Sequence, residues 1–340
     1  MSTLPQVLGF ARTGGAPTAR RSAAVALGLA SALVLAACSN PSDGGTTDVA
    51  ATKGTKTKIN ISPGQNRITT DKVDSIAAEV PEAIRKRGTL EIVNSSGSAA
   101  PLTFYATDNK TVIGVEPDLA YLVAAVLGLK PHISTVSWEN IFVGLDSGKY
   151  DVGFSNITDT EERKEKYDFA SYREDNLGFE AKKGSGLKVT GPKDVAGRTV
   201  AVGSGTNQEK LLIEWSKEDV KAGLKPVNIK YYQNDSDTYL ALQSGRIDLY
   251  LGPNPTAAYH AATTGRSEVV GTYSGAGATL QGLIAATTKK DNGLVKALAD
   301  ALNEIIDNGT YAKVLKRWGL SGEAVAKSEI NPPGLPKTNK

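Results

Sequence analysis

A short stretch occurs twice in this chain, and it limits the folds that the chain can adopt. Residues 145–153 read LDSGKYDVG, and residues 242–250 read LQSGRIDLY. In each copy an apolar helical pattern ends at Ser-Gly, a basic residue and an aspartate follow, and an apolar strand begins. The segments GTLEIV from Gly88 and GRTVAV from Gly197 are also similar, and they come in the same order. Two such similarities indicate two lobes of similar design.

Helical and strand patterns alternate through both lobes. Apolar residues follow helical spacing over 117–127, 138–145, 294–305 and 311–318, and short apolar runs lie between such segments. This alternation predicts an α/β fold with mostly parallel sheets.

The two strands that follow the repeated stretch predict where a ligand binds. In open α/β sheets, ligands bind beyond the carboxyl ends of the strands. Those ends are residues 154–158 in the first lobe and 251–254 in the second. We therefore expect a site in a cleft that both segments line.

The N-terminus has the pattern of a secretory signal. Arg20 and Arg21 precede an apolar run over 23–37, which is short for a membrane span. The run ends in Leu-Ala-Ala-Cys, which resembles a bacterial lipoprotein box. We expect residues 1–37 to be a lipoprotein signal peptide and Cys38 to carry the lipid. Residues 38–72 are polar and rich in Gly and Lys, and they predict a flexible tether.

Charge and composition exclude several classes of function. The chain has 39 Lys and Arg against 36 Asp and Glu, but three arginines lie in the signal segment, so the rest is balanced. Nucleic-acid binding therefore has no electrostatic support. One cysteine excludes an internal disulfide, and two histidines leave little for a zinc site. We expect no nucleic-acid partner, no metal and no cofactor.

Several motifs in a fixed order give the chain a family resemblance. They are NITDTEER (156–163), YDFASY (167–172), GVEPDLA (114–120), the GSGT that follows GRTVAV, SGRID (244–248) and the terminal GTY and WG. From about Gly88 to Gly319 the chain resembles the family 3 extracellular solute-binding proteins, the polar-amino-acid receptors of bacterial ABC importers. The resemblance implies a two-lobed periplasmic-binding-protein fold of type II with two hinge strands. It places lobe 1 at 86–178 plus 280–327, lobe 2 at 179–279 and a C-terminal tail at 328–340.

Arg163 is the strongest candidate for a binding residue. Asp159 followed by Glu162 predicts a capping box, so residues 160–163 would form a first helical turn. A helix N-terminus beside an arginine fork can bind a carboxylate. The resemblance implies that Arg163 holds the ligand carboxylate and that Thr158 donates its hydroxyl. The alternative is a surface arginine paired with one of the nearby glutamates, Glu161, Glu162 or Glu165.

The second lobe offers GSGTNQ (203–208) after a strand. It lacks the third glycine of a dinucleotide fingerprint and the Gly-Lys-Ser/Thr of a phosphate loop. It is either a tight strand-to-helix turn or, as the resemblance implies, a loop that closes over the ligand with Thr206 and Asn207. Trp138 is either a core tryptophan or packs on the ligand side chain. The remaining candidate ligand-binding residues are Asn156, Ser155, Asn254 and Ser96.

Two departures from the family pattern concern the ligand. Ala99 stands where the family has a stacking aromatic residue, and Ser96 lies where an acid is frequent, which argues against a long cationic ligand such as arginine. Pro253 stands where the family has the aspartate that binds the ligand ammonium group. Either another acid such as Glu116 or Asp118 reaches the site, or the ligand is not an ordinary α-amino acid. The sequence leaves both open.

These observations predict a monomeric, extracytoplasmic receptor anchored to the cell membrane by lipid. It would capture a small polar solute, an amino acid in the first instance, by hinge closure and deliver it to an ABC permease served by ATPase subunits. We expect it not to be an enzyme. The alternatives are a ligand-sensing lipoprotein for a signalling partner, a receptor for a carboxylate solute without an α-amino group, and an enzyme on the same scaffold.

Overall fold

The computed structural model describes residues 46–50, 56–95, 100–232 and 234–337, and these described residues form one compact unit. The predicted signal peptide, Cys38 and Ser96 lie outside the described residues. The strands are β1 (Thr46–Ala50), β2 (Lys56–Asn60), β3 (Thr89–Ser95), β4 (Phe104–Tyr105), β5 (Val112–Ile113), β6 (Lys130–Val136), β7 (Val152–Gly153), β8 (Tyr167–Lys182), β9 (Thr199–Val202), β10 (Asn228–Tyr231), β11 (Leu249–Pro253), β12 (Ser267–Ser274) and β13 (Gly282–Lys289). The helices are α1 (Asp74–Ala77), α2 (Glu82–Arg87), α3 (Val115–Val126), α4 (Trp138–Asp146), α5 (Asn207–Lys221), α6 (Asp235–Ser244), α7 (Asn254–Thr264), α8 (Val295–Asp307) and α9 (Thr310–Arg317). None of these helices is both long enough and apolar enough to cross a membrane.

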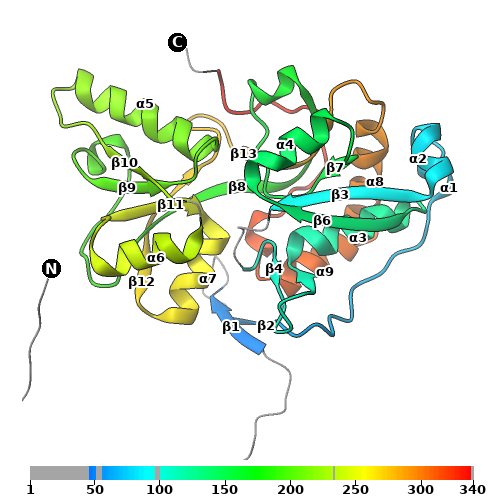
Figure 1. Cartoon of the computed structure of the whole chain (residues 1–340), viewed down its shortest axis with the longest axis horizontal. Coiled ribbons are helices and arrows are strands. Elements are labelled where there is room, and N and C mark those ends of the chain that lie inside the picture. The colour runs from blue at the N-terminus through cyan, green and yellow to red at the C-terminus, as the bar shows by residue number, and fades with distance from the viewer. Residues whose placement is uncertain (1–45, 51–55, 96–99, 233, 338–340) are drawn as a thin grey trace, which may run out of the picture. The chain divides into compact units, whose positions relative to one another are not determined.

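The long strand β8 belongs to both lobes (Figure 1). Its first part, up to Asp175, pairs antiparallel with β13, and from Asn176 onward it pairs with β12 and β11. Strands β3, β6 and β7 are parallel in lobe 1, and β9, β10 and β11 are parallel in lobe 2. The predicted α/β two-lobed fold is therefore confirmed, with the change of lobe slightly before the predicted boundary at residue 178. Below, lobe 1 means residues 56–175 plus 282–337, and lobe 2 means residues 176–281.

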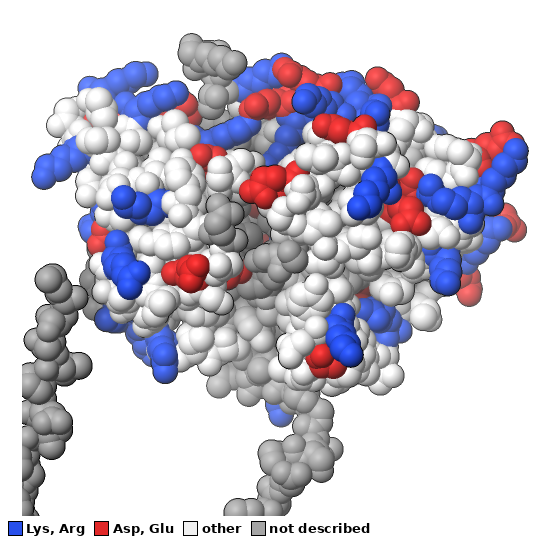
Figure 2. Space-filling model, in the orientation of Figure 1, with Lys and Arg blue, Asp and Glu red and all other residues white. Residues whose placement is uncertain are grey.

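Each lobe has helices on both faces of its sheet. In β3 the side chains of Leu90 and Ile92 pack into a core with α3, α8 and α9, while Val93 packs on the opposite face with Ile141 and Leu145 of α4. This alternation is the period of two that a strand imposes. In lobe 2 the larger core lies under α5, and a smaller one lies under α6. Lys and Arg are interspersed with Asp and Glu on the face shown in Figure 2.

The predicted tether extends too far along the chain. Residues 56–72 pack on lobe 1: β2 pairs with β1, the Ile59 side chain is 1% exposed, and Ile61 and Ile68 lie against the same core. The Arg67 Nε donates a hydrogen bond of 2.9 Å to the buried Asp118 carboxylate. The composition of this segment is polar, but its few isoleucines reach an apolar surface that composition cannot reveal.

The C-terminal tail also packs on the folded unit. Ile330 forms a β-bridge with Ala170, and Leu335 forms one with Thr160. Before the tail, the buried Glu323 accepts a hydrogen bond from Arg173 of β8. The tail therefore lies beside the first part of β8 and the residues just before it.

Replacing Arg67 tests whether this segment is part of the fold. We expect Arg67→Ala to lower the free energy of unfolding by about 1–3 kcal/mol, because the buried Asp118 loses a charged donor. The measurement is urea unfolding, with the exposed Lys58→Ala as control, which should change stability by less than about 0.5 kcal/mol. Equal effects of the two variants would mean that residues 56–72 are a tether after all.

Candidate functional site

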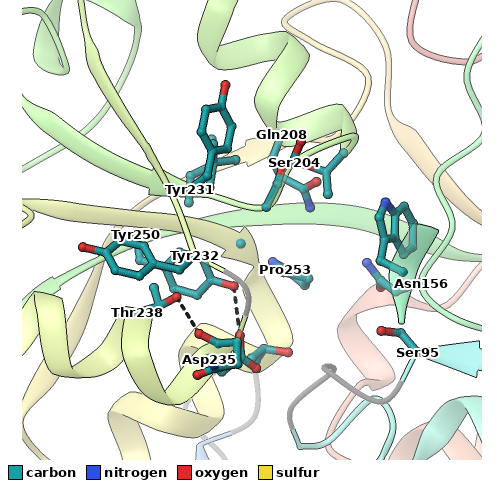
Figure 3. A pocket seen from close by; sticks show the side chains of 18 of the residues that line it. Ser95, Asn156, Ser204, Gln208, Tyr231, Tyr232, Asp235, Thr238, Tyr250 and Pro253 are labelled. Atoms are coloured by element: carbon teal, nitrogen blue, oxygen red, sulfur yellow. Dashed lines mark hydrogen bonds between the residues drawn. The ribbon is translucent and has the colours of Figure 1, made fainter. Parts of the chain in front are cut away.

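A cavity of about 240 Å³ lies between the lobes, where the carboxyl ends of the strands from both lobes meet. This is the place that the sequence predicts for ligand binding. Ser95 ends β3 and Tyr231 ends β10 (Figure 3), and Ser155 follows β7. Lobe 1 contributes Ser95, Leu102, Ser137, Trp138, Glu139, Ser155 and Asn156, and lobe 2 contributes residues of 202–208, 231–238 and 250–256.

The predicted helical turn at Arg163 is different in the structure. Residues Arg163–Glu165 form a single 3-10 turn, and the Thr160 hydroxyl accepts the backbone N–H of Arg163 at 3.1 Å. The predicted capping box is therefore wrong, because Thr160 takes the role expected of Asp159. The Asp159 carboxylate is instead fully buried, and its only partner within the described residues is the Lys164 ammonium group, 3.4 Å from one of its oxygens. Burial raises the pKa of Asp159 to about 7.

The Arg163 side chain joins the two lobes. It donates hydrogen bonds to the Thr158 carbonyl at 2.8 Å and to the Gly205 carbonyl, in lobe 2, at 3.2 Å. Its guanidinium lies over the rings of Trp138 and Phe142, 5.3 and 5.4 Å from their centres. Desolvation lowers the pKa of Arg163 to about 10, so it stays charged.

The alternative for Arg163, a surface pairing with a nearby glutamate, is wrong. Those glutamates form their ion pairs with lysines: Glu161 with Lys164, Glu162 with Lys210 and Glu165 with Lys337. The guanidinium lies over the ring of Trp138, which lines the cavity, but Arg163 itself is not among the lining residues.

Asp175 holds two of the predicted ligand donors at the point where β8 changes lobes. Its Oδ2 accepts hydrogen bonds from the Thr158 hydroxyl in lobe 1 at 2.7 Å and from the Asn207 amide in lobe 2 at 2.9 Å. Burial raises the pKa of this carboxyl group. A Cβ on Gly275 would fall 1.7 Å from the same oxygen, so only glycine fits there. The sequence analysis missed Asp175, because no local pattern distinguishes it.

The other predicted residues are divided between the cavity and its surroundings. Trp138 lines the cavity, in accord with the ligand-side alternative, and so do Ser155, Asn156, Thr206 and Asn207. Thr158 and Asn254 do not line the cavity. Asn254 is the first residue of α7 and packs against Gly178. Asn156 has a left-handed backbone (φ 51°), and its amide oxygen accepts a hydrogen bond from Arg173.

Neither acid that the sequence proposed reaches the cavity. Glu116 is buried and accepts hydrogen bonds from Tyr172 and Arg173. Asp118 is bound by Arg67 and by the Trp318 indole. The acids that do line the cavity are Glu139 and Asp235, which the sequence analysis missed.

The sequence analysis also missed three tyrosines of lobe 2. Tyr231, Tyr232 and Tyr250 line the lobe 2 side, opposite Ser95 and Asn156 (Figure 3). Tyr231 ends β10 and Tyr232 follows it. Because ligands bind beyond the carboxyl ends of strands, the same rule that located the end of β11 could have predicted these two tyrosines.

The two lobes and the cavity between them define a solute-binding protein. The profile of the bacterial extracellular solute-binding proteins, family 3, matches residues 92–321, and the chain belongs to this family.

Individual relatives agree with this assignment. The L-cystine-binding protein TcyJ of Escherichia coli is 30% identical over 236 residues, covering 69% of this chain and 84% of the relative. The arginine-binding protein ArgT of Corynebacterium glutamicum is 29% identical over 270 residues, covering 79% and 86%. Among solved structures, an ancestral arginine-binding protein bound to arginine is 30% identical with a TM-score of 0.59, covering 68% of this chain and 98% of the other.

The buried Asp159 predicts a pH dependence of stability. Its pKa is raised from 3.8 to about 7, so between these values the folded protein holds a proton that the unfolded chain releases. Stability therefore falls as the pH rises through this window. We expect urea unfolding at pH 4.5 and 7.5 to show a loss in the wild type that exceeds the loss in Asp159→Asn by about 2–4 kcal/mol.

The exposed Asp307→Asn serves as control and should keep the wild-type dependence. Identical pH dependence in Asp159→Asn and the wild type would contradict the raised pKa of the buried Asp159.

Proposed function

We propose that this protein is a lipid-anchored receptor that captures an amino acid between its lobes and delivers it to an ABC permease. The observation that carries the proposal is the cavity at the strand ends, which both lobes line with polar and aromatic groups. The cystine- and arginine-binding relatives support an amino acid as the solute. The solute would bridge the lobes and stabilise the closed arrangement.

The solute carboxylate would bind at the N-terminus of α5, and the Arg163 guanidinium, which lies beside the cavity, would turn toward it as the solute binds. A helix N-terminus offers unpaired N–H groups and a favourable dipole. Thr206 caps this helix by accepting the Glu209 N–H at 3.2 Å, and Asn207 and Gln208 of its first turn line the cavity. An arginine side chain has five N–H groups, and the hydrogen bonds of Arg163 to Thr158 and Gly205 each use one of them, so others remain for a carboxylate. Ser155 and Asn156 would contact the solute from lobe 1.

Contacts between the lobes already favour closure. Besides the bond from Arg163 to Gly205, Lys210 of α5 pairs with Glu162 of lobe 1. Exposed pairs of this kind contribute little on their own. A bound solute that contacts both lobes would therefore supply most of the difference between open and closed populations.

Replacing Arg163 tests the binding proposal. The purified protein is stripped of carried-over solute by partial unfolding and dialysis, then screened by thermal shift against the twenty amino acids, dicarboxylates, amines and sugars. A solute at about 1,000 times its Kd should add about 4 kcal/mol and raise Tm by several degrees. We expect an amino acid to do so, and Arg163→Ala to weaken its affinity at least about 30-fold, because a charge-assisted contact is lost.

The control Arg246→Ala removes an exposed arginine of lobe 2 and should leave the affinity within about twofold. A solute without an amino group as the best binder would change the solute class. No shift with any compound would contradict the receptor proposal and favour a sensor for a signalling partner.

The lipid anchor has a separate test. In a bacterial host we expect the wild type in the membrane fraction and Cys38→Ser in the soluble fraction, because the thiol is the acylation site and a hydroxyl cannot replace it. The neighbouring Ser39→Ala should stay with the membrane. Equal distribution of wild type and Cys38→Ser would contradict lipidation at Cys38.

A further inference from the structure

One acid that lines the cavity forms no ion pair with any of the described residues. Asp235 is the first residue of α6 and lines the lobe 2 side. Within the described residues, its only side-chain hydrogen bond comes from the Tyr250 hydroxyl, at 3.5 Å. No lysine, arginine or histidine is among the described residues that line the cavity. A carboxylate enclosed in this way costs free energy until a cation joins it.

The titratable groups around Asp235 do not supply that cation. His260 of α7 lies near, but its ring pairs with the buried Glu180 of β8. Tyr239 of α6 stacks on His260, and Tyr250 of β11 only donates a hydrogen bond. Glu139, across the cavity in lobe 1, adds a second negative charge. Burial raises the pKa of Asp235 to about 6, and the hydrogen bond from Tyr250 and the nearby His260 offset this effect only in part.

The surroundings of Asp235 suit a positively charged nitrogen. Tyr232 and Tyr250 line the same side of the cavity, and their rings can attract a cation. Tyr250 also connects Asp235 to the wall where β11 ends, because a Cβ on Gly252 would lie 2.9 Å from its hydroxyl oxygen. The carboxylate of α6 is thus brought toward Gly252 and Pro253, where β11 itself has no acid.

We propose that Asp235 binds the cationic nitrogen of the solute, an α-ammonium, side-chain ammonium or guanidinium group. This inference rests on the proposed function, since it assumes that the cavity takes a solute. It places the positive end of the solute on lobe 2, at the beginning of α6, and the carboxylate at the beginning of α5. A dicarboxylate without an amino group does not fit, because it would face two acids.

The test compares Asp235→Asn with Asp237→Asn by titration calorimetry. Asp237 lies in the same first turn of α6, is exposed and does not line the cavity, so its variant removes the same charge from nearly the same place. The probes are L-arginine, L-cystine, L-glutamine and glutarate. For the amino acid that binds tightest, we expect Asp235→Asn to weaken the affinity at least about 30-fold and Asp237→Asn by less than about threefold.

Analogues of arginine identify which nitrogen is bound. Citrulline keeps the α-ammonium group and loses the side-chain cation, whereas Nα-acetylarginine keeps only the guanidinium. The analogue whose binding remains sensitive to Asp235→Asn carries the nitrogen that Asp235 contacts.

A pH profile separates a binding role from a structural one. Wild-type affinity should fall about tenfold between pH 7 and pH 5, as Asp235 takes up a proton, and the affinity of Asp235→Asn should stay nearly constant. Without solute, the Tm of Asp235→Asn should be no lower than that of the wild type, because the neutral amide avoids the cost of burying a charge.

The failures can be told apart. Amino-acid binding that is equal in the wild type and Asp235→Asn would overturn this inference and leave the proposed function standing. Tightest binding of glutarate would also overturn it while preserving solute capture. No binding of any probe by the wild type would overturn the proposed function and, with it, the role of Asp235.

Discussion

One strand shared by two lobes is the constraint on which the rest of the molecule depends. β8 pairs with β13 up to Asp175 and with β12 and β11 from Asn176 onward. Because both half-sheets continue from this strand, the carboxyl ends of their parallel strands face one cavity. The Asp175 carboxylate sits at the change of partner and binds Thr158 from one lobe and Asn207 from the other.

Several charged side chains are buried near this part of β8. Arg173, two residues before Asp175, is buried with Glu116 and Glu323 and also fixes the Asn156 amide at the cavity wall. Such a network contributes little net stability relative to apolar packing, but removing one partner leaves a buried charge uncompensated. The charged groups around Arg173 therefore bind one another and position the cavity wall. Asp235, by contrast, faces the cavity and forms no ion pair with the described residues.

The sequence predicted the features that local patterns encode. The repeated Ser-Gly-basic-x-Asp stretch identified two similar lobes, and the strand-end rule located the loops at 154–158 and 251–254. It could not predict that Thr158 and Asn207 share Asp175, because that contact joins three separate segments. The sequence did not predict Asp235 for a related reason. It lies in a helix well before Pro253 in the chain, and only the tertiary fold brings the two residues to the same wall of the cavity. The tether was overextended because a few isoleucines in polar sequence carry no periodic signal.

The account depends on a solute that both lobes hold, with its charges divided between them. A crystal structure of the protein with its tightest-binding amino acid tests this most directly. The account predicts a cationic nitrogen within about 2.7–3.0 Å of the Asp235 carboxylate and the carboxylate of the solute at Arg163 and the first turn of α5. A solute bound by one lobe alone, or one that leaves Asp235 without a cation, would contradict it.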